Sequence, residues 1–447
     1  MSYFRYSVLV FLIFGTSLAY AQIIIAVAGN DTAGYNGDSG PAIAARLFGP
    51  GGVALDGSGN LFISDSHNNR IRCVNTAGII TTVAGTGYGS YSGDGGAATA
   101  ATLNNPSGIT SDANGDLYVA DYNNNCIRRI TSGGIISTFA GNDSAGYRGD
   151  GGPATAAWIF GPTSVAVDKS GNVYIADNLN SRVRKVDTSG IITTIAGNGL
   201  TSFSGDGGPA VSAELDARGV TTDNEGNIYI ADYNSARIRK INTDGIIHTI
   251  AGNGSLGYTG DGGQATAAEL YYPTGVAVDK YGNVFIADLG ENCVRSINNE
   301  GIISTIAGNG TVGNSGNGGP ATAAKLNAPI AVLADKAGNI YIADILADVV
   351  REISAFNNQT ASFSKMYSHL IKIWPQPSTG VFNMSVSSLL NEPVEIILTG
   401  IKGQEVMKTT GVTNTVKIIN AGAVPPGSYN VTTQAKEWSC TEQVTIW

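Results

Sequence analysis

The chain of 447 residues repeats one pattern six times, and this period constrains its fold more than any other feature. A glycine-rich phrase, such as YSGDGGAATAATL at 91–103, recurs with its acidic position at Asp38, Asp94, Asp150, Asp206 and Asp261, and with Asn317 in the last copy. A second phrase, such as YIAD, ends at Asp65, Asp121, Asp177, Asp232, Asp288 and Asp344. Copies of the glycine-rich phrase are 56 residues apart, except for one step of 55 between Asp206 and Asp261. Such a period indicates an array of one supersecondary unit stacked on its neighbours.

Each unit carries four short runs of β-strand character. In the third unit they read SVAVD, NVYIAD, RVRKV and IITTIAG, rich in β-branched residues and bounded by Gly, Asn or Asp. The segment 168–172 (DKSGN) between the first two runs is typical of a tight hairpin. Six four-stranded antiparallel sheets arranged radially predict an all-β fold, a six-bladed β-propeller.

The two ends of the array predict how the ring closes. The sixth unit has three strand-like runs, and no GIISTIAG phrase follows its third run, which ends at Ile353. The missing run stands at the other end, as IIIAVAG at 23–29. We therefore expect the N-terminal strand to complete the last blade. The alternative, an open solenoid, would leave two sheet edges unpaired.

Targeting and charge narrow the class of protein. Residues 1–21 have a positive start, an apolar core and an Ala-Tyr-Ala cleavage pattern, which predicts a signal peptide. No later stretch reaches the roughly 18 apolar residues of a transmembrane helix.

The net charge of −9 argues against nucleic acid as a partner. Four cysteines without a dense framework predict no structural disulfide inside the repeats, and Cys126 and Cys293 occupy the same repeat position.

Phrases such as GVAVD, GNVYIAD, RIRKI and GIITTIAG are similar to the NHL repeat. The resemblance covers all six units, about residues 23–354, and the longer repeat with its YxGDGG loop resembles secreted bacterial NHL proteins and the NHL region of teneurins. It implies a propeller at 22–355. NHL propellers act as binding scaffolds and, less often, as enzymes, so the resemblance specifies the fold more than the function.

After the propeller we expect a linker at 356–370 and a small β-sandwich at 371–447, because short alternating runs begin at Ile371. The segment 374–380 (WPQPSTG) resembles the C-terminal sorting domain of the type IX secretion system of Bacteroidota, with Gln376 in place of the usual Asn. This resemblance implies the secretion machinery as a partner and a secreted or outer-surface location after signal-peptide export to the periplasm. The alternative is an ordinary carbohydrate-binding or immunoglobulin-like sandwich.

A carboxylate and a guanidinium recur seven residues apart in every blade, at the end of one strand and on the returning strand. This spacing predicts a structural ion pair with bidentate geometry, rather than six catalytic carboxylates. The pairs are Asp65 with Arg72, Asp121 with Arg128, Asp177 with Arg184, Asp232 with Arg239, Asp288 with Arg295, and Asp344 with Arg351.

The glycine-rich loop itself is interpreted as a structural connector. It lacks the lysine of a phosphate loop, and its single carboxylate falls short of the six to eight oxygen ligands of calcium, although calcium stays open as an alternative. We expect its aspartate to cap the short ATAA helix and its aromatic residue to anchor the loop by packing. We also expect these loops to share one mouth of the channel with the short loops after each YIAD-type phrase.

Specific contacts are expected where the repeats differ, since a rigid scaffold carries function on its variable loops. Aromatic residues on a polar rim suit sugars or peptide side chains, although each of them is also compatible with plain packing at the rim. The candidates are Trp158, Phe160, Tyr271, Tyr272 and Phe48 before the first strands, and His67, Tyr122 and Tyr233 after the YIAD-type phrases.

Three functions fit these patterns. The first is a secreted or cell-surface binding protein whose loop-rich face takes a protein or glycan ligand, without a cofactor. The second is an enzyme, a metal-dependent lyase or lactonase working at the channel mouth, although the chain has only three histidines and no nucleophile set stands out from the repeats. The third is a structural component of a surface layer or adhesive matrix.

Overall fold

The computed structural model describes residues 22–354 and, beyond them, the segments 371–374, 381–386, 393–400, 404–412, 416–420, 427–434 and 439–446. The predicted signal peptide and linker, and most of the WPQPSTG segment, lie outside the described residues. Within the described part, no helix is long and apolar enough to cross a bilayer.

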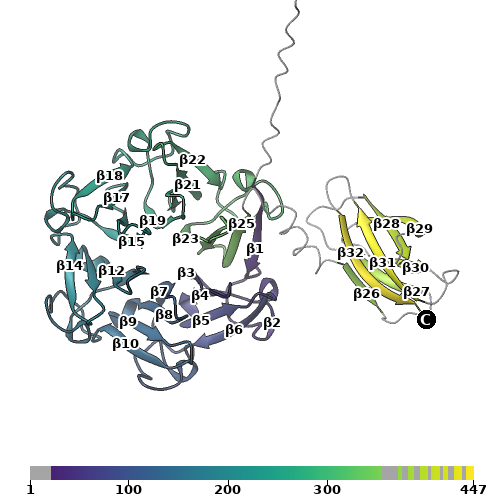
Figure 1. The fold of residues 1–447 in the computed structure, drawn as a ribbon, viewed down its shortest axis with the longest axis horizontal. Helices are drawn as coiled ribbons and strands as arrows, with labels where there is room; N and C mark the ends of the chain where they lie inside the picture. The colour runs from purple at the N-terminus through teal and green to yellow at the C-terminus, as the bar shows by residue number, and fades with distance from the viewer. Residues whose placement is uncertain are drawn as a thin grey trace, which may run out of the picture.

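Six sheets of mainly four antiparallel strands form a ring (Figure 1). Blades one and two hold β2 (Gly40–Pro41), β3 (Pro50–Leu55), β4 (Leu61–Asp65), β5 (Arg70–Val74) and β6 (Ile79–Ala84), then β7 (Pro106–Ser111), β8 (Leu117–Asp121), β9 (Cys126–Ile130) and β10 (Ile136–Gly141). Blades three and four hold β11 (Pro162–Val167), β12 (Val173–Asp177), β13 (Arg182–Val186) and β14 (Ile192–Ala196), then β15 (Ala217–Thr222), β16 (Ile228–Asp232), β17 (Arg237–Ile241) and β18 (Ile247–Ala251). Blades five and six hold β19 (Pro273–Val278), β20 (Val284–Asp288), β21 (Cys293–Ile297) and β22 (Ile303–Ala307), then β23 (Pro329–Ala334), β24 (Ile340–Asp344), β25 (Val349–Ile353) and β1 (Ile24–Ala28). The predicted six-bladed propeller is confirmed.

Short 3-10 helices occur in two kinds of connection between strands. One series follows the glycine-rich phrases: η1 (Ala42–Ala44), η3 (Ala98–Ala100), η5 (Ala154–Ala156), η7 (Ala210–Ser212), η8 (Ala265–Ala267) and η9 (Ala321–Ala323). The other follows the YIAD-type phrases: η2 (Ser66–Asn68), η4 (Tyr122–Asn124) and η6 (Asn178–Asn180).

The N-terminal strand closes the ring, as predicted. β1 pairs antiparallel with β25, with Ile24 opposite Ile353, and the sixth blade reads β1-β25-β24-β23. Ile24 is fully buried in the core of that blade. Its backbone N–H donates to the Gly319 carbonyl at 3.2 Å, so the loop that precedes the sixth blade also covers this strand. A ring closed in this way has no unpaired end blade.

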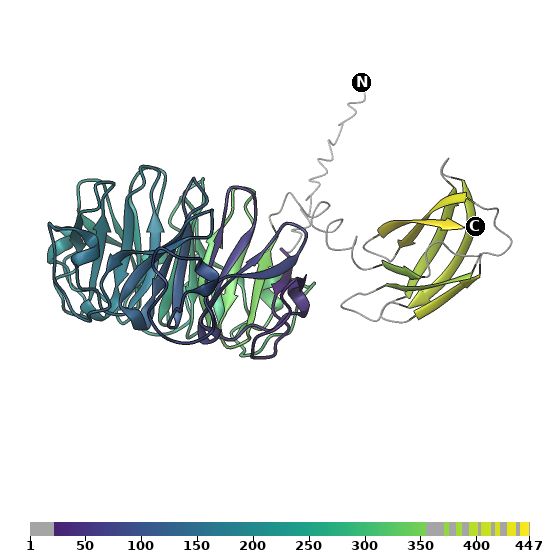
Figure 2. The same cartoon turned by 90° about the horizontal axis from the view of Figure 1, so that it is seen from below.

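The cores lie between neighbouring blades. One cluster combines Tyr118 and Ile127 of the second blade with Val173 and Ile175 of the third. Alanines of the 3-10 helices join these layers, and Ala154 of η5 is 2% exposed. The first strand of each blade lies innermost, around the central channel (Figure 1). Seen from the side, the strands run between the two faces of the ring, where the loops lie (Figure 2).

The described C-terminal segments form two sheets. One has the order β26-β27-β30, and the other β29-β28-β31-β32. Their strands are β26 (Ile371–Trp374), β27 (Val381–Val386), β28 (Pro393–Gly400), β29 (Glu405–Val412), β30 (Val416–Asn420), β31 (Gly427–Gln434) and β32 (Ser439–Ile446). The packing of these sheets as a sandwich stays a prediction.

Candidate binding face at the channel mouth

The glycine-rich loops lie along the outer edges of the sheets. In the first blade, Gly40 pairs with Ile80 of the outermost strand β6, and the backbone N–H of Ala42 donates to the Gly78 carbonyl at 2.8 Å. The start of β6 lies at the end of the blade away from the YIAD-type loops, so the loop runs along the whole outer edge. This corrects the expectation that the glycine-rich segments surround the channel mouth. They satisfy backbone groups that an edge strand would otherwise expose.

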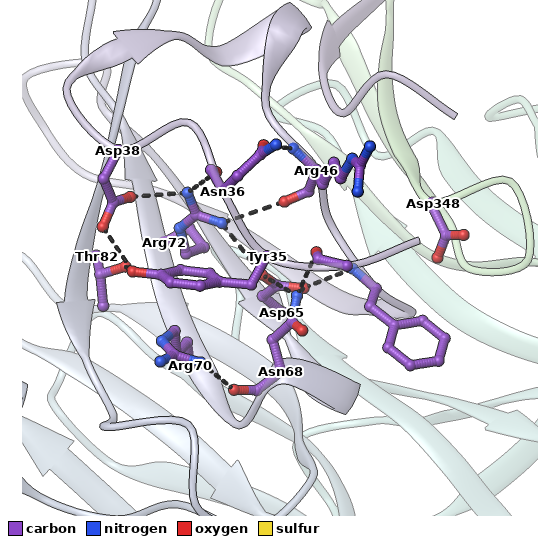
Figure 3. Close-up of polar contacts among 12 residues, drawn as sticks. Tyr35, Asn36, Asp38, Arg46, Asp65, Asn68, Arg70, Arg72, Thr82 and Asp348 are labelled. Carbon is purple, nitrogen blue, oxygen red and sulfur yellow. Dashed lines mark hydrogen bonds and ion pairs between the residues drawn. The ribbon is translucent and has the colours of Figure 1, made fainter. Parts of the chain in front are cut away.

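The aspartate of this loop binds a buried arginine of the blade it covers (Figure 3). The Arg72 Nη2 atom lies 2.7 Å from Asp38 Oδ1, and the Arg72 side chain is fully buried. The Tyr35 hydroxyl donates to Asp38 Oδ2 at 2.9 Å. The expected helix cap is therefore wrong, because no side chain caps η1, whose N-cap residue is Pro41. The carboxylate instead binds a buried cation. A buried guanidinium without a charged partner is more costly than an uncapped backbone N–H of a three-residue helix, so the arginine is the stronger competitor for the carboxylate.

The same ion pair recurs in the next four blades, where the arginine and loop aspartate lie 2.5–2.7 Å apart. The carboxylate seven residues earlier is the weaker partner: Asp65 Oδ2 lies 3.2 Å from Arg72 Nη1, and one nitrogen rather than two makes the contact. The bidentate geometry is thus wrong, because the second nitrogen is taken by the loop. In the other blades the distance between this carboxylate and the arginine varies. Asp121, Asp177 and Asp232 contact Arg128, Arg184 and Arg239 at 3.2–3.4 Å, and Asp344 lies 3.9 Å from Arg351. In the fifth blade, Asp288 Oδ2 is buried without a hydrogen-bond partner among the described residues, so Arg295 does not bind it.

Burial raises the pKa of these second carboxyls. It raises the pKa of Asp121 and Asp177 to about 6, and that of Asp288 and Asp344 to about 7, although a backbone N–H bond and the arginine in each blade lower it. Each one also accepts the backbone N–H of the last loop residues before strand one, as Asp288 does from Tyr271 at 2.8 Å. The equivalent donors are Phe48, Asn104, Phe160, Asp216 and Asn327. These carboxylates therefore fix the end of the preceding loop at the mouth.

The last residues of the loops do reach the channel mouth. The backbone N–H of His67 donates to the Phe48 carbonyl at 3.0 Å, and their rings meet edge to face with centroids 4.7 Å apart. Leu179 donates in the same way to Phe160 at 3.1 Å. The two kinds of loop are thus tied together at this face.

The structure brings some of the aromatic candidates together and separates others. Tyr272 stacks on Tyr233 with centroids 4.6 Å apart and contacts Tyr271 at 4.8 Å. Trp158 is 36% exposed but lies against the Arg148 side chain of its own loop, and Phe160 is 38% exposed. Among the described residues, neither makes a ring contact with another candidate.

A cavity of 360 Å³ opens in the channel, lined by the inner strands and by mouth residues that include His67 and Tyr122. Most inner-strand positions in it carry Gly, Ala, Ser, Thr or Val. Arg218 lines it too, and the sequence interpretation missed this residue. The signal was present: the second position of the first strand holds an uncharged residue in five blades, namely Gly51, Ser107, Thr163, Thr274 and Ile330, and an arginine in the fourth.

The fourth blade differs because its repeat is one residue short. The missing residue is the one directly before strand one. In the other blades this residue has a positive φ angle: Gly49, Asn105, Gly161, Tyr272 and Ala328. Asp216 stands at this junction and is 4% exposed, with its two oxygens accepting from Asn178 at 2.6 Å and Asn234 at 2.5 Å. Burial raises the pKa of Asp216, although Arg218 nearby lowers it. The short connection therefore places a polar cluster at one point of the mouth.

Comparison with known proteins matches the repeats to the family described as the Teneurin NHL domain, in four overlapping stretches that together span residues 87–314. Residues 49–74 match the NHL repeat. The chain belongs to the teneurin-type NHL family. Human Teneurin-4 is 32% identical over 284 residues, which cover 54% of this chain and 10% of the teneurin. Zebrafish (Danio rerio) Teneurin-3 is 27% identical over 365 residues, covering 69% of this chain and 12% of the relative. The NHL chain thus spans about a tenth of the length of these curated relatives.

Solved structures share the fold of this NHL propeller at low sequence identity. An auxiliary nutrient binding protein from Bacteroides thetaiotaomicron has a TM-score of 0.54 and 17% identity, with 74% of this chain and 76% of that chain covered. A similar protein from Bacteroides ovatus also has a TM-score of 0.54, with 17% identity and coverage of 75% and 77%. At this level of identity, the likeness shows the fold alone.

The C-terminal part matches a second family. Residues 372–446 match the secretion system C-terminal sorting domain. This agrees with the resemblance of the WPQPSTG segment and supports export of the NHL protein.

Metal ligands do not gather in the part of the NHL chain that the structure describes: no group of three or more His, Cys, Asp or Glu side chains there could hold an ion. In the first blade, the loop carboxylate of Asp38 already contacts Arg72 and Tyr35.

Proposed function

We propose that this NHL protein is a secreted or cell-surface binding protein that presents the channel mouth to a protein or glycan ligand. The observation that carries this proposal is the contrast between the repeated and the singular residues. The repeated aspartates and arginines bind one another, whereas His67, Tyr122 and Arg218, which differ between the repeats, line the 360 Å³ cavity. The Phe48 ring packs against His67, and Tyr272 stacks on Tyr233. Large aromatic residues held by rigid loops are typical anchors of binding faces.

The sorting domain supports the location of this face. We infer that residues 371–447 engage the type IX secretion machinery, after signal-peptide export to the periplasm, and that residues 22–355 are the functional unit of the exported protein, joined by a linker at 356–370. The match of residues 372–446 to the sorting family supports this route. A propeller delivered outside the cell meets glycans and surface proteins first.

Binding of the full chain to glycan and surface-protein arrays tests the proposal. Once a ligand is found, F48A, F160A and Y271A should each weaken its binding about tenfold, the range expected for anchor residues. Y281A is the matched control, because Tyr281 is 64% exposed in the hairpin between β19 and β20, at the far end of the blade from the mouth. If all four variants bound the ligand as tightly as the parent protein, the ligand would bind another surface.

A further inference from the structure

Arg218 is the one arginine or lysine among the described residues that line the cavity, and none of those residues carries a carboxylate. Its guanidinium lies over the Tyr233 ring, 4.4 Å from the centroid. The Arg218 Nε atom is buried without a hydrogen-bond partner.

The neighbouring Asp216 does not neutralise this cation by direct contact. The ion pairs of the described residues do not include Arg218, and both oxygens of Asp216 accept from asparagine amides instead. A guanidinium placed this way has donors left for a ligand, and guanidinium groups match carboxylates in planar geometry. One cation without a second beside it balances one negative charge, which favours a carboxylate over a phosphate dianion.

The hydroxyl groups around the cavity favour a different part of the ligand. Ser107 donates its hydroxyl proton to the Thr163 carbonyl at 3.0 Å, and Thr163 donates to the Arg218 carbonyl at 2.8 Å. Ser66 donates to the Pro106 carbonyl at 2.5 Å. Each proton is used between neighbouring blades, so these oxygens remain as acceptors. Acceptors around a cavity bind donors, and the hydroxyl groups of a sugar are such donors.

We propose that the channel mouth is a binding site for a monoanionic sugar acid, with its carboxylate on Arg218 and its hydroxyl groups toward Ser66, Ser107 and Thr163. The volume of 360 Å³ suits a monosaccharide or the end unit of a longer acidic glycan. This inference rests on the proposed binding function and names the ligand class of the same face.

Saturation-transfer NMR and calorimetry on the full chain test the site with galacturonate and glucuronate, against galactose and glucose as neutral counterparts. The acids should bind at least tenfold more tightly than the neutral sugars. R218T should remove this preference, since threonine stands at the same position in two other blades and fits the fold. K169T is the control, because it removes an exposed positive charge from the β11–β12 hairpin at the opposite end of the blade.

Three results would overturn the proposal: equal binding of acidic and neutral sugars, equal loss in R218T and K169T, or tighter binding of inorganic phosphate than of the uronates. A protein that binds an array ligand through Phe48 or Tyr271 but ignores uronates would refute only this inference. Uronate binding that is lost in R218T but unchanged in F48A and Y271A would keep the Arg218 site and contradict the role of the aromatic residues in the proposed function.

Discussion

Replacing Asn317 by aspartate should stabilise the sixth blade. In the other five blades an aspartate stands at this position, 2.5–2.7 Å from the buried arginine. In the sixth, Arg351 is fully buried, its nearest carboxylate oxygen, on Asp344, is 3.9 Å away, and its Nε atom has no hydrogen-bond partner. The Asn317 Oδ1 atom is also buried without a partner. The N317D variant supplies the missing charge where an acceptor is already unused.

The magnitude follows from the kind of bond gained. A hydrogen bond to a charged group contributes about 1.5–3 kcal/mol to stability, but the loop aspartates are 35–42% exposed, and solvent screens them. We therefore expect N317D to raise the free energy of unfolding by about 1 kcal/mol, which corresponds to a rise in Tm of roughly 1–2 °C for a propeller of this size. The reverse change, D150N in the third blade, should lower the free energy of unfolding by about 1–2 kcal/mol, because Asp177 at 3.3 Å is then the one carboxylate left beside the buried Arg184.

Urea denaturation of the full chain, followed by circular dichroism, measures both variants against the parent. If D150N destabilises and N317D leaves the midpoint unchanged or lowers it, the missing charge is not what weakens the sixth blade. If neither variant moves the midpoint, the loop ion pairs do not stabilise the propeller, and the argument from their recurrence fails.

Two further predictions concern a buried carboxyl and the closing strand. Asp288 has its pKa raised to about 7 in the folded chain, against an ordinary value of 3.8, so its contribution favours folding more as pH falls from 8 toward 4. D288N should flatten the dependence of the urea midpoint on pH between 5 and 8, and parallel curves for variant and parent would contradict this. I24A should lower the free energy of unfolding by about 3 kcal/mol, because Ile24 is fully buried where the ring closes. I43A should change this free energy little, because Ile43 is 60% exposed. A similar loss in urea midpoint for both would show that β1 does not lock the ring.

The period of the chain was enough to predict the blades, their number and their closure. Four strand-like runs per unit and a missing fourth run after Ile353 allow only one economical partner for residues 23–29, because a sheet edge left open is costly. The NHL family could be predicted from the same repeated phrases. These are local patterns, repeated often enough to be unambiguous.

The roles of individual polar residues were harder to predict. The seven-residue spacing indicated Asp65 as the main partner of Arg72, yet Asp38, which lies 34 residues before the arginine, makes the shorter contact. Spacing along a hairpin cannot show that a distant loop returns along the outer edge. Arg218 escaped notice because its importance depends on six innermost strands meeting around one channel.

The sequence by itself determined the architecture of this protein, since hydrophobic periodicity and turn residues act over a few positions and recur in every unit. Tertiary structure alone decided which carboxylate meets each buried arginine, where the glycine-rich loops lie, and which side chain supplies the charge of the channel. These outcomes depend on surfaces built from segments far apart in the chain, where burial and the competition for hydrogen-bond partners set the arrangement.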